Sequence, residues 1–249
     1  MPFVFIGSPL DQIFQTHLPP EMQGDPRLPG IGPCGPEDWL RVDETYAGQL
    51  AYRAHLIATA PETVIWCAPD ARPAAREMLE EALAILPSLG FAVDAANVTC
   101  PDGRVVRTDF ERPLYTLGHL LQEDICILQK QGDEHVLTAA VLCFPASWSL
   151  AEKVGRPLTA IHTPVAEYDG NIANRVQRLF DGVQVGRPLW RFNKLMYVDS
   201  DLHQPSHRMR PNAPVFLRSE RQCILRLPKS EAVVFTIHTW VLDQFHAGI

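Results

Sequence analysis

The sequence predicts an α+β fold, in which an antiparallel sheet of about five strands is packed against helices on one side. Two observations lead to this prediction. Apolar residues recur with helical spacing in the first half of the 249-residue chain, and strand-like segments dominate the second half. The strand-like segments comprise one hairpin and three consecutive strands at the end of the chain, an order that favours antiparallel pairing over alternating βαβ units.

The chain begins with a segment rich in proline and glycine, and we interpret residues 1–37 as an extended arm. Residues 38–249 are expected to form a single domain whose first portion is helical. The first helix is predicted where apolar residues from Trp39 to Ile57 recur close to helical spacing. These features place the sheet, and any chemistry it supports, after about Glu123.

Two further helices are predicted before the sheet. A short apolar strand, Thr63–Cys67, precedes the first of them. Asp70 can cap this helix and Pro87 ends it. The next helix starts after Asp109, with leucines on one face. The helical portion is therefore expected to contain three helices and one isolated strand.

After Leu121 the pattern changes to strands. A hairpin loop at Gln131–Glu134 separates two apolar runs, and Ser149 with Glu152 forms a capping-box pattern that opens a short helix. A further helix is centred on Ile172–Phe180, with Gly182 as its stop. The predicted strands are Ile125–Leu128, His135–Cys143, Trp190–Val198, Val215–Leu227 and Ala232–Val241.

Composition excludes several classes of protein. The net charge of -7 and pI of about 5.7 disfavour nucleic acid as a partner, because phosphate contacts need clustered lysine and arginine. No apolar run approaches the roughly 20 residues of a membrane-spanning helix, so we expect no membrane partner. The six cysteines form no Cys-x-x-Cys pair, which predicts free thiols in a reducing cytoplasm. Nucleotide-binding loops and the common hydrolase motifs are also missing from the sequence.

Charged residues crowd the strand predicted at Val215–Leu227. Its apolar neighbours predict an inner strand, where charges must be paired or must bind an anion. A solvated edge strand with one ion pair is the alternative. Alternate residues of a strand share a face. We therefore expect Arg221 on one face and four polar residues on the other, namely Arg218, Glu220, Gln222 and Arg226.

The preceding strand has one polar and one aromatic face. Arg191 and Asn193 share the first, and Trp190 and Phe192 share the second. This pattern fits a sheet that lines a pocket. On the local pattern alone, a half-buried strand without a ligand is the favoured interpretation.

His162 lies between apolar neighbours just before Pro164. Neutral imidazole is a ligand for zinc, copper or haem iron, so His162 is a candidate metal ligand. A core histidine satisfied by hydrogen bonds is the alternative. Other histidines compete for the role, namely His119 in a leucine-rich helix, His238 in the last strand and His203 in a polar loop.

Several short motifs follow one another in a specific order, although none is specific alone. They are Trp39 with Asp43, Tyr46 and Arg53; Gln122–Asp124; Phe144–Trp148 with Glu152–Gly155; Ile161–Val165; Arg191–Asn193; Arg218–Gln222 with Arg226–Pro228; and Phe235–Ile237. In this order and spacing the chain resembles the haem-dependent oxidative N-demethylase alpha-subunit-like family, from about Trp39 to Trp240.

The resemblance implies a PAS-like fold, in which an antiparallel sheet forms one wall of a haem pocket, with helices packed around it and an N-terminal helical extension. It also implies an oxygen-using haem b enzyme that demethylates a small secondary amine and releases formaldehyde. In the characterised type, electrons come from NADPH through separate flavin and iron–sulfur subunits. Since this chain has neither a flavin nor a cluster signature, we expect a separate reductase as partner.

The resemblance also suggests roles for individual residues. We expect His162 to be the axial ligand of the haem iron. Glu220 is the candidate catalytic residue, which would hold a cationic amine or relay a proton. The other candidate cofactor contacts are Asn193 and, for the haem propionates, Arg191, Arg221 and Arg226.

Two positions depart from the family pattern. Lys194 stands where the family usually has tryptophan, and Ala166 where it usually has proline. These departures leave the haem expectation in place and leave the identity of the amine open. The alternative function is a non-catalytic PAS-like haem or small-molecule sensor, because a fold alone does not determine an activity.

Overall fold

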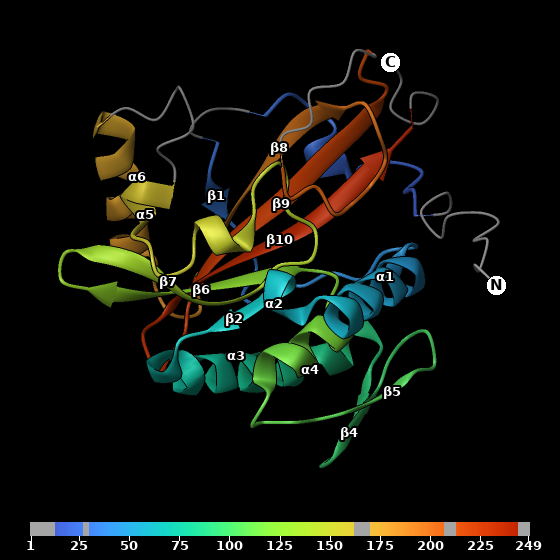
Figure 1. The fold of residues 1–249 in the computed structure, drawn as a ribbon, viewed down its shortest axis with the longest axis horizontal. Coiled ribbons are helices and arrows are strands. Elements are labelled where there is room, and N and C mark those ends of the chain that lie inside the picture. The colour runs from blue at the N-terminus through green and yellow to red at the C-terminus, as the bar shows by residue number, and fades with distance from the viewer. Residues whose placement is uncertain (1–12, 27–29, 162–169, 207–212, 244–249) are drawn as a thin grey trace.

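The structure, a computed structural model, describes residues 13–26, 30–161, 170–206 and 213–243. Its main feature is a seven-stranded antiparallel sheet with the order β1-β8-β9-β10-β6-β7-β2 (Figure 1). The strands are β1 (Gly32–Pro33), β2 (Ile65–Cys67), β6 (Asp124–Gln131), β7 (Glu134–Val141), β8 (Leu189–Tyr197), β9 (Phe216–Arg226) and β10 (Val233–Leu242). A separate three-stranded sheet contains β3 (Ala92–Val93), β4 (Asn97–Thr99) and β5 (Val105–Arg107).

The prediction of about five strands was too low, although the five predicted strands form the centre of the sheet. Two edge strands complete it. β1 pairs with β8 and β2 pairs with β7. β1 has only two residues, too few for a periodic pattern, and its Pro33 is tolerated because an edge strand needs no N–H on its outer side. The segment of β2 was predicted as a strand, but its sequence does not reveal which strand it joins.

The helices follow the predicted order with shifted boundaries. α1 begins at Tyr46 rather than near Trp39. Trp39 is buried, as its apolar character predicts, but it lies in a non-helical segment before the helix. Asp70 does not cap α3, whose N-cap position is held by Ala71. No described helix is long and apolar enough to cross a membrane. The α-helices are α1 (Tyr46–Thr59), α2 (Pro61–Val64), α3 (Arg72–Ile85), α4 (Pro113–Leu120), α5 (Leu158–Ile161) and α6 (Gly170–Gly182), and the 3₁₀ turns are η2 (Pro20–Met22), η3 (Pro69–Ala71), η4 (Leu86–Leu89) and η5 (Leu150–Glu152).

The capping box predicted at Ser149 is confirmed. The Ser149 backbone N–H donates to Glu152 Oε2 at 3.0 Å, and the reciprocal bond to the Ser149 side chain is present. The turn that it opens is the 3₁₀ turn η5 rather than a longer helix. The capping-box pattern therefore predicted where this element begins but not how long it is.

Helices cover both faces of the large sheet, so the expectation of helices on one side only is wrong. Helices α1, α3 and α4 pack on the face that carries Ile125 and Ile127, which we call the α1 face. Helices α5 and α6 pack on the opposite face, which carries Cys126 and Leu128 and which we call the α6 face (Figure 1). The reason lies in the sequence, because β6 is apolar at consecutive positions and an inner strand with two apolar faces needs cover on both.

Candidate functional site

A buried carboxylate, Glu220, lies on the α6 face of β9 and is held by neighbouring polar side chains. Its Oε2 accepts hydrogen bonds from Asn193 Nδ2 and Gln222 Nε2, each at 3.1 Å. Asn193 Oδ1 in turn accepts the Glu220 backbone N–H at 2.9 Å. β8 and β9 pair with Asn193 opposite Glu220. β9 lies between β8 and β10 as an inner strand, as its apolar neighbours in the sequence predicted.

Arg218 secures the other oxygen of Glu220. The Arg218 side chain is buried, and its guanidinium donates to the carbonyl oxygens of Leu202 at 3.0 Å and Phe144 at 2.5 Å. It lies 3.4 Å from Glu220 Oε1, a long contact compared with the 2.7–2.9 Å typical of charge-assisted bonds. Glu220 Oε1 is therefore able to accept a shorter hydrogen bond from a ligand.

Arg191 is a cation on the same face, and no acceptor for its guanidinium lies among the described residues. It lies opposite Gln222 on β8. Among the contacts that the described residues make, none is a hydrogen bond or ion pair from its guanidinium. Burial lowers the pKa of Arg191, and the Glu220 carboxylate offsets part of that effect. A half-buried guanidinium without an acceptor is suited to an anionic ligand, which would restore the stabilisation lost on burial.

Lys153 is a second cation of this kind, which the sequence reasoning did not select. Its Nζ stands 4.4 Å from the centroid of the Trp148 ring, and burial lowers the pKa of this amine. Cys126, on the α6 face of β6, is the first of the groups that act on its charge. The sequence did carry a signal for this residue. Lys153 belongs to the Glu152–Gly155 motif, follows Trp148, and has Glu152 as its adjacent acidic residue.

The sheet is left partly uncovered between these groups. β10 is a central strand, and each of its residues is buried except Phe235, which is half-buried on the α6 face. Phe235 lies opposite Ile224 of β9 and Cys126 of β6. An aromatic ring left partly exposed at the centre of a sheet shows that α5 and α6 cover this point incompletely. We call Arg191, Asn193, Glu220, Gln222 and Phe235 the open patch.

Arg221 lies on the opposite face, as its position in the strand predicted. On the α1 face its guanidinium donates to the Asp38 carbonyl oxygen at 2.7 Å and to Asp38 Oδ2 at 2.8 Å. It also stands 4.9 Å from the centroid of the Trp190 ring. The structure therefore does not bring Arg221 together with Glu220 and Arg191.

Arg226 shares the α6 face but is used by the fold. Its guanidinium donates at 2.8 Å to each of three carbonyl oxygens, those of Phe180, Val183 and Glu231. Two of these carbonyls end α6, where backbone oxygens lack helical partners. Arg226 thus fastens the end of α6 to the sheet. His162 lies outside the described residues, directly after Ile161, whose side chain packs on the apolar cluster of the α6 face.

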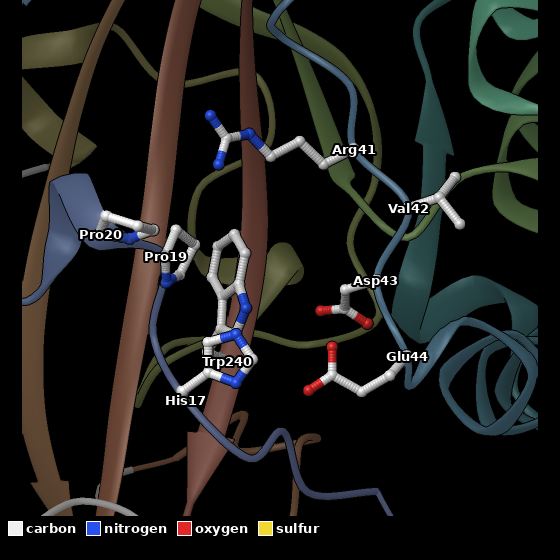
Figure 2. A pocket seen from close by; sticks show the side chains of 8 residues that line it. All are labelled: His17, Pro19, Pro20, Arg41, Val42, Asp43, Glu44 and Trp240. Atoms are coloured by element: carbon white, nitrogen blue, oxygen red, sulfur yellow. The ribbon is translucent and has the colours of Figure 1, made fainter.

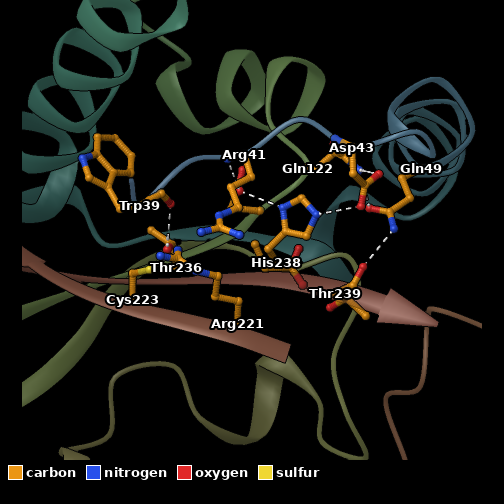
Figure 3. Close-up of polar contacts among 12 residues, drawn as sticks. Trp39, Arg41, Asp43, Gln49, Gln122, Arg221, Cys223, Thr236, His238 and Thr239 are labelled. Carbon is orange, nitrogen blue, oxygen red and sulfur yellow. Dashed lines mark hydrogen bonds and ion pairs between the residues drawn. The ribbon is translucent and has the colours of Figure 1, made fainter. Parts of the chain in front are cut away.

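A buried histidine forms a second polar centre on the α1 face. His238 Nδ1 donates to Glu123 Oε1 at 2.8 Å and Nε2 donates to Asp43 Oδ2 at 3.1 Å (Figure 3). Burial alone would lower the pKa of His238, but the two carboxylates outweigh it and raise the pKa to about 9. Since both ring nitrogens carry protons, this imidazolium has no lone pair for a metal.

Asp43 connects this centre to the arm and to Gln122, in the segment that follows α4. Its carboxylate accepts from Gln15 Nε2, from Gln122 Nε2 and from the Thr45 backbone N–H, each at 2.8 Å. Burial would raise the pKa of Asp43, but the bonds from His238 and the two amides hold it far below its usual range. Within the described residues, Glu123 Oε2 is buried without a partner.

A surface pocket of about 440 Å³ adjoins Asp43. Figure 2 shows the carboxylates of Asp43 and Glu44 pointing across it toward the Trp240 ring. Arg41 at one end is already paired with Glu21 at 2.6 Å. The lining residues are His17, Pro19, Pro20, Arg41, Val42, Asp43, Glu44 and Trp240.

The chain matches one family profile over most of its length. The profile is described as "Haem-dependent oxidative N-demethylase, alpha subunit-like" and matches residues 30–244. This range includes both polar centres and all strands of the large sheet. No group of three or more histidine, cysteine, aspartate or glutamate side chains able to hold a metal ion occurs in the part of the chain that the structure describes.

Proposed function

The chain belongs to the haem-dependent oxidative N-demethylase alpha-subunit-like family, and we propose that it is an oxidoreductase that uses haem b and O₂ to demethylate a small amine, with release of formaldehyde. The observation that supports a site on this chain is the open patch. In this patch a buried carboxylate, Glu220, lies near a partly exposed ring, Phe235, and near Arg191, a half-buried cation that has no acceptor among the described residues.

The residues of the α6 face fit a haem. A haem needs apolar surface for its ring, cations for its propionates and an axial ligand for its iron. Phe235 supplies partly exposed apolar surface, and Arg191 and Lys153 are cations that form no ion pair among the described residues. We propose His162 as the axial ligand, because α5 leads the chain into the apolar cluster of this face at Ile161.

Not all the candidate cations are equally available to a propionate. Arg221 and Arg226 donate to acceptors of the protein itself, and each would have to give these up to bind a carboxylate of the cofactor. Arg191 has no such bonds to lose. We therefore assign the propionate contacts to Arg191 and Lys153, and a supporting role to Arg221 and Arg226.

Bound haem would supply the oxygen and electron-transfer chemistry. The chain's own contribution is to hold the amine. Glu220 Oε1 would accept a hydrogen bond from the amine N–H, and the fixed amides of Asn193 and Gln222 would keep the carboxylate oriented. Exclusion of water from this buried carboxylate strengthens its attraction for a cationic amine. In this proposal Glu220 would also take up the proton that the amine releases.

Turnover requires an electron donor that this chain does not carry. We propose a separate flavin and iron–sulfur reductase, which would share the cytoplasm that we expect for the chain. A non-catalytic PAS-like haem sensor uses the same pocket without the reductase, so activity and not haem binding separates the two functions.

The test is an absorption spectrum followed by an assay for formaldehyde. Purified protein with one equivalent of haemin should show a Soret band and a higher melting temperature, because haem binds the folded state. With a reductase system and secondary amines it should release formaldehyde, and Glu220→Gln should keep the Soret band but lose this release. A Soret band without release from any amine would favour the sensor. If haemin changes neither the spectrum nor the melting temperature, the proposal is wrong.

A further inference from the structure

Lys153 stands apart from the other lysines of the chain, and we propose that its amine forms a Schiff base with a small aldehyde such as formaldehyde. The chain has four lysines, and the Nζ of Lys153 makes no hydrogen bond or ion pair with any described residue. The other three are held: Lys130 Nζ lies 2.6 Å from Asp181 Oδ1, Lys194 Nζ donates to the Gln23 carbonyl oxygen at 2.8 Å, and Lys229 Nζ lies 2.7 Å from Glu80 Oε2. This inference goes beyond the proposed function, because it concerns the chain without haem.

The turn η5 leaves Lys153 without an acidic partner. Glu152 is its neighbour in the sequence, but the Glu152 carboxylate accepts the Ser149 backbone N–H at 3.0 Å as part of the capping box. Cys126 is the other titratable group that acts on the charge of Lys153. Burial raises the pKa of Cys126 to about 12, so this side chain is an uncharged thiol at neutral pH. Neither residue therefore forms an ion pair with Lys153.

The Trp148 ring holds the amine in place. Lys153 Nζ lies 4.4 Å from the centroid of this ring. Ser147, which precedes the tryptophan, has a φ of 64°, a left-handed conformation that is costly for a residue with a side chain. Two bonds fix that conformation, one from the Ser147 N–H to the Gln204 carbonyl oxygen at 2.7 Å and one between the Ser147 and Tyr197 hydroxyls at 2.9 Å. Because an aromatic face attracts cations, the ring stabilises the iminium that the reaction forms as well as the ammonium.

Burial makes this amine a better nucleophile than an exposed lysine. It lowers the pKa of Lys153, and Cys126 and Glu152 offset only part of that effect. More of the side chain is therefore uncharged at neutral pH, and the uncharged amine is the form that attacks a carbonyl. Since Lys153 is only half-buried, a molecule as small as formaldehyde reaches it.

The reaction conserves all atoms and needs no oxidant. The Lys153 Nζ attacks the carbonyl carbon, the C–N bond forms, and the π electrons of the carbonyl move to oxygen. A proton passes from nitrogen to that oxygen and gives a carbinolamine, whose hydroxyl then leaves as water with the second N–H proton. One amine and one aldehyde thus give one imine and one water, and a proton from solvent converts the imine to the iminium. A haem propionate bound to Lys153 would pair its charge, so we expect the reaction in the chain without haem.

Lys194 offers a matched control within the same chain. It is half-buried like Lys153, but its Nζ donates to the Gln23 carbonyl oxygen. If exposure alone governed reactivity, these two lysines would react alike. The more exposed Lys130 and Lys229 would then react fastest, although each is held by a carboxylate.

The experiment treats the purified chain, without added haemin, with formaldehyde and sodium cyanoborohydride, which reduces the imine to N-methyl-lysine. Peptide mass spectrometry gives the rate at each lysine. At neutral pH Lys153 should be methylated about tenfold faster than Lys194, and the ratio should shrink as the pH rises to about 10, because an ordinary lysine then also loses its proton. Lys153→Arg should remove the fast site and leave the rate at Lys194 unchanged. Equal or slower methylation of Lys153 at neutral pH, or a ratio that does not change with pH, would overturn the proposal.

Discussion

His238 Nδ1 lies 2.8 Å from Glu123 Oε1, and each of these side chains is only 2% exposed. The pKa of His238 is about 9 in the folded protein, against about 6.5 for an unfolded chain. Because the folded state binds this proton more tightly, the stability that it contributes is fully present below pH 6.5 and is lost as pH rises through about 9. Urea unfolding should show the free energy of unfolding falling by up to roughly 3 kcal/mol over this range.

The control for this prediction is His238→Asn, which keeps a hydrogen-bond donor but does not titrate. The variant should be less stable than the parent below about pH 6.5, and the difference between the two proteins should shrink as the pH approaches about 9. A difference that stays constant over this range would show that His238 is not protonated in the fold.

A second prediction concerns the buried ion pair between Arg53 and Asp124. Arg53 Nη1 donates to Asp124 Oδ1 at 2.6 Å, and the side chains are 0% and 1% exposed. Asp124 also accepts the backbone N–H groups of Cys143 at 2.7 Å and Phe144 at 2.8 Å. Asp124→Asn should lower the free energy of unfolding by about 3–5 kcal/mol, because it leaves Arg53 buried without a counter-charge.

The matched control is the exposed pair of Lys130 and Asp181, which has the same 2.6 Å separation. Asp181→Asn should cost less than about 1 kcal/mol, since solvent screens an exposed pair. Chemical denaturation of both variants gives the comparison. Similar losses for the two variants would contradict the assignment of the larger effect to burial.

The sequence predicted the parts of the fold that depend on local pattern. Within each strand, alternation correctly placed Arg191 with Asn193 and separated Glu220 from Arg221, because a strand repeats every two residues whatever surrounds it, but it did not predict that Asn193 lies opposite Glu220. It could not show that Arg221 would be taken up by Asp38, which is 183 residues away. The partner with which a side chain pairs depends on packing between segments that are distant in the sequence.

The buried centre at His238 shows the same limit. Its two carboxylate partners are 115 and 195 residues away in the sequence, and neither distance leaves a local signal. The histidine was therefore weighed only as a possible iron ligand. The cover on the second face, in contrast, did have a local signal, because β6 is apolar at consecutive positions and an inner strand with two apolar faces needs cover on both.

A third prediction separates two arginines of the α6 face, Arg191 and Arg226. Arg191→Gln should leave the free energy of unfolding within about 0.5 kcal/mol of the parent, because the guanidinium has no acceptor among the described residues to lose. It should weaken haem binding by about tenfold if Arg191 binds a propionate. Haemin titration followed at the Soret band measures the affinity, and urea unfolding of the haem-free protein measures the stability.

Arg226→Gln is the matched substitution and should behave in the opposite way. It removes three hydrogen bonds from the guanidinium to backbone carbonyls at 2.8 Å, so the free energy of unfolding should fall by about 2 kcal/mol or more. Haem affinity should change less than in Arg191→Gln once the folded fraction is taken into account. A larger loss of haem affinity in Arg226→Gln would reassign the propionate contact to Arg226.

The last prediction is that His162 is the axial ligand of the haem iron. Three histidines can be compared with it. His238 uses both ring nitrogens within the fold, His119 lies on α4 and bonds Tyr115 through Nδ1, and His203 bonds the Cys143 carbonyl oxygen through Nδ1 at 2.7 Å. Only His162 directly follows a helix that packs on the α6 face. His162→Ala should leave the haem-free melting temperature close to that of the parent, shift the Soret band and weaken haem retention, because the iron–nitrogen bond is removed. Imidazole added to this variant should restore the Soret position. An unchanged spectrum in His162→Ala, with the change appearing instead in His203→Ala or His119→Ala, would assign the ligand to that residue and leave the haem proposal standing.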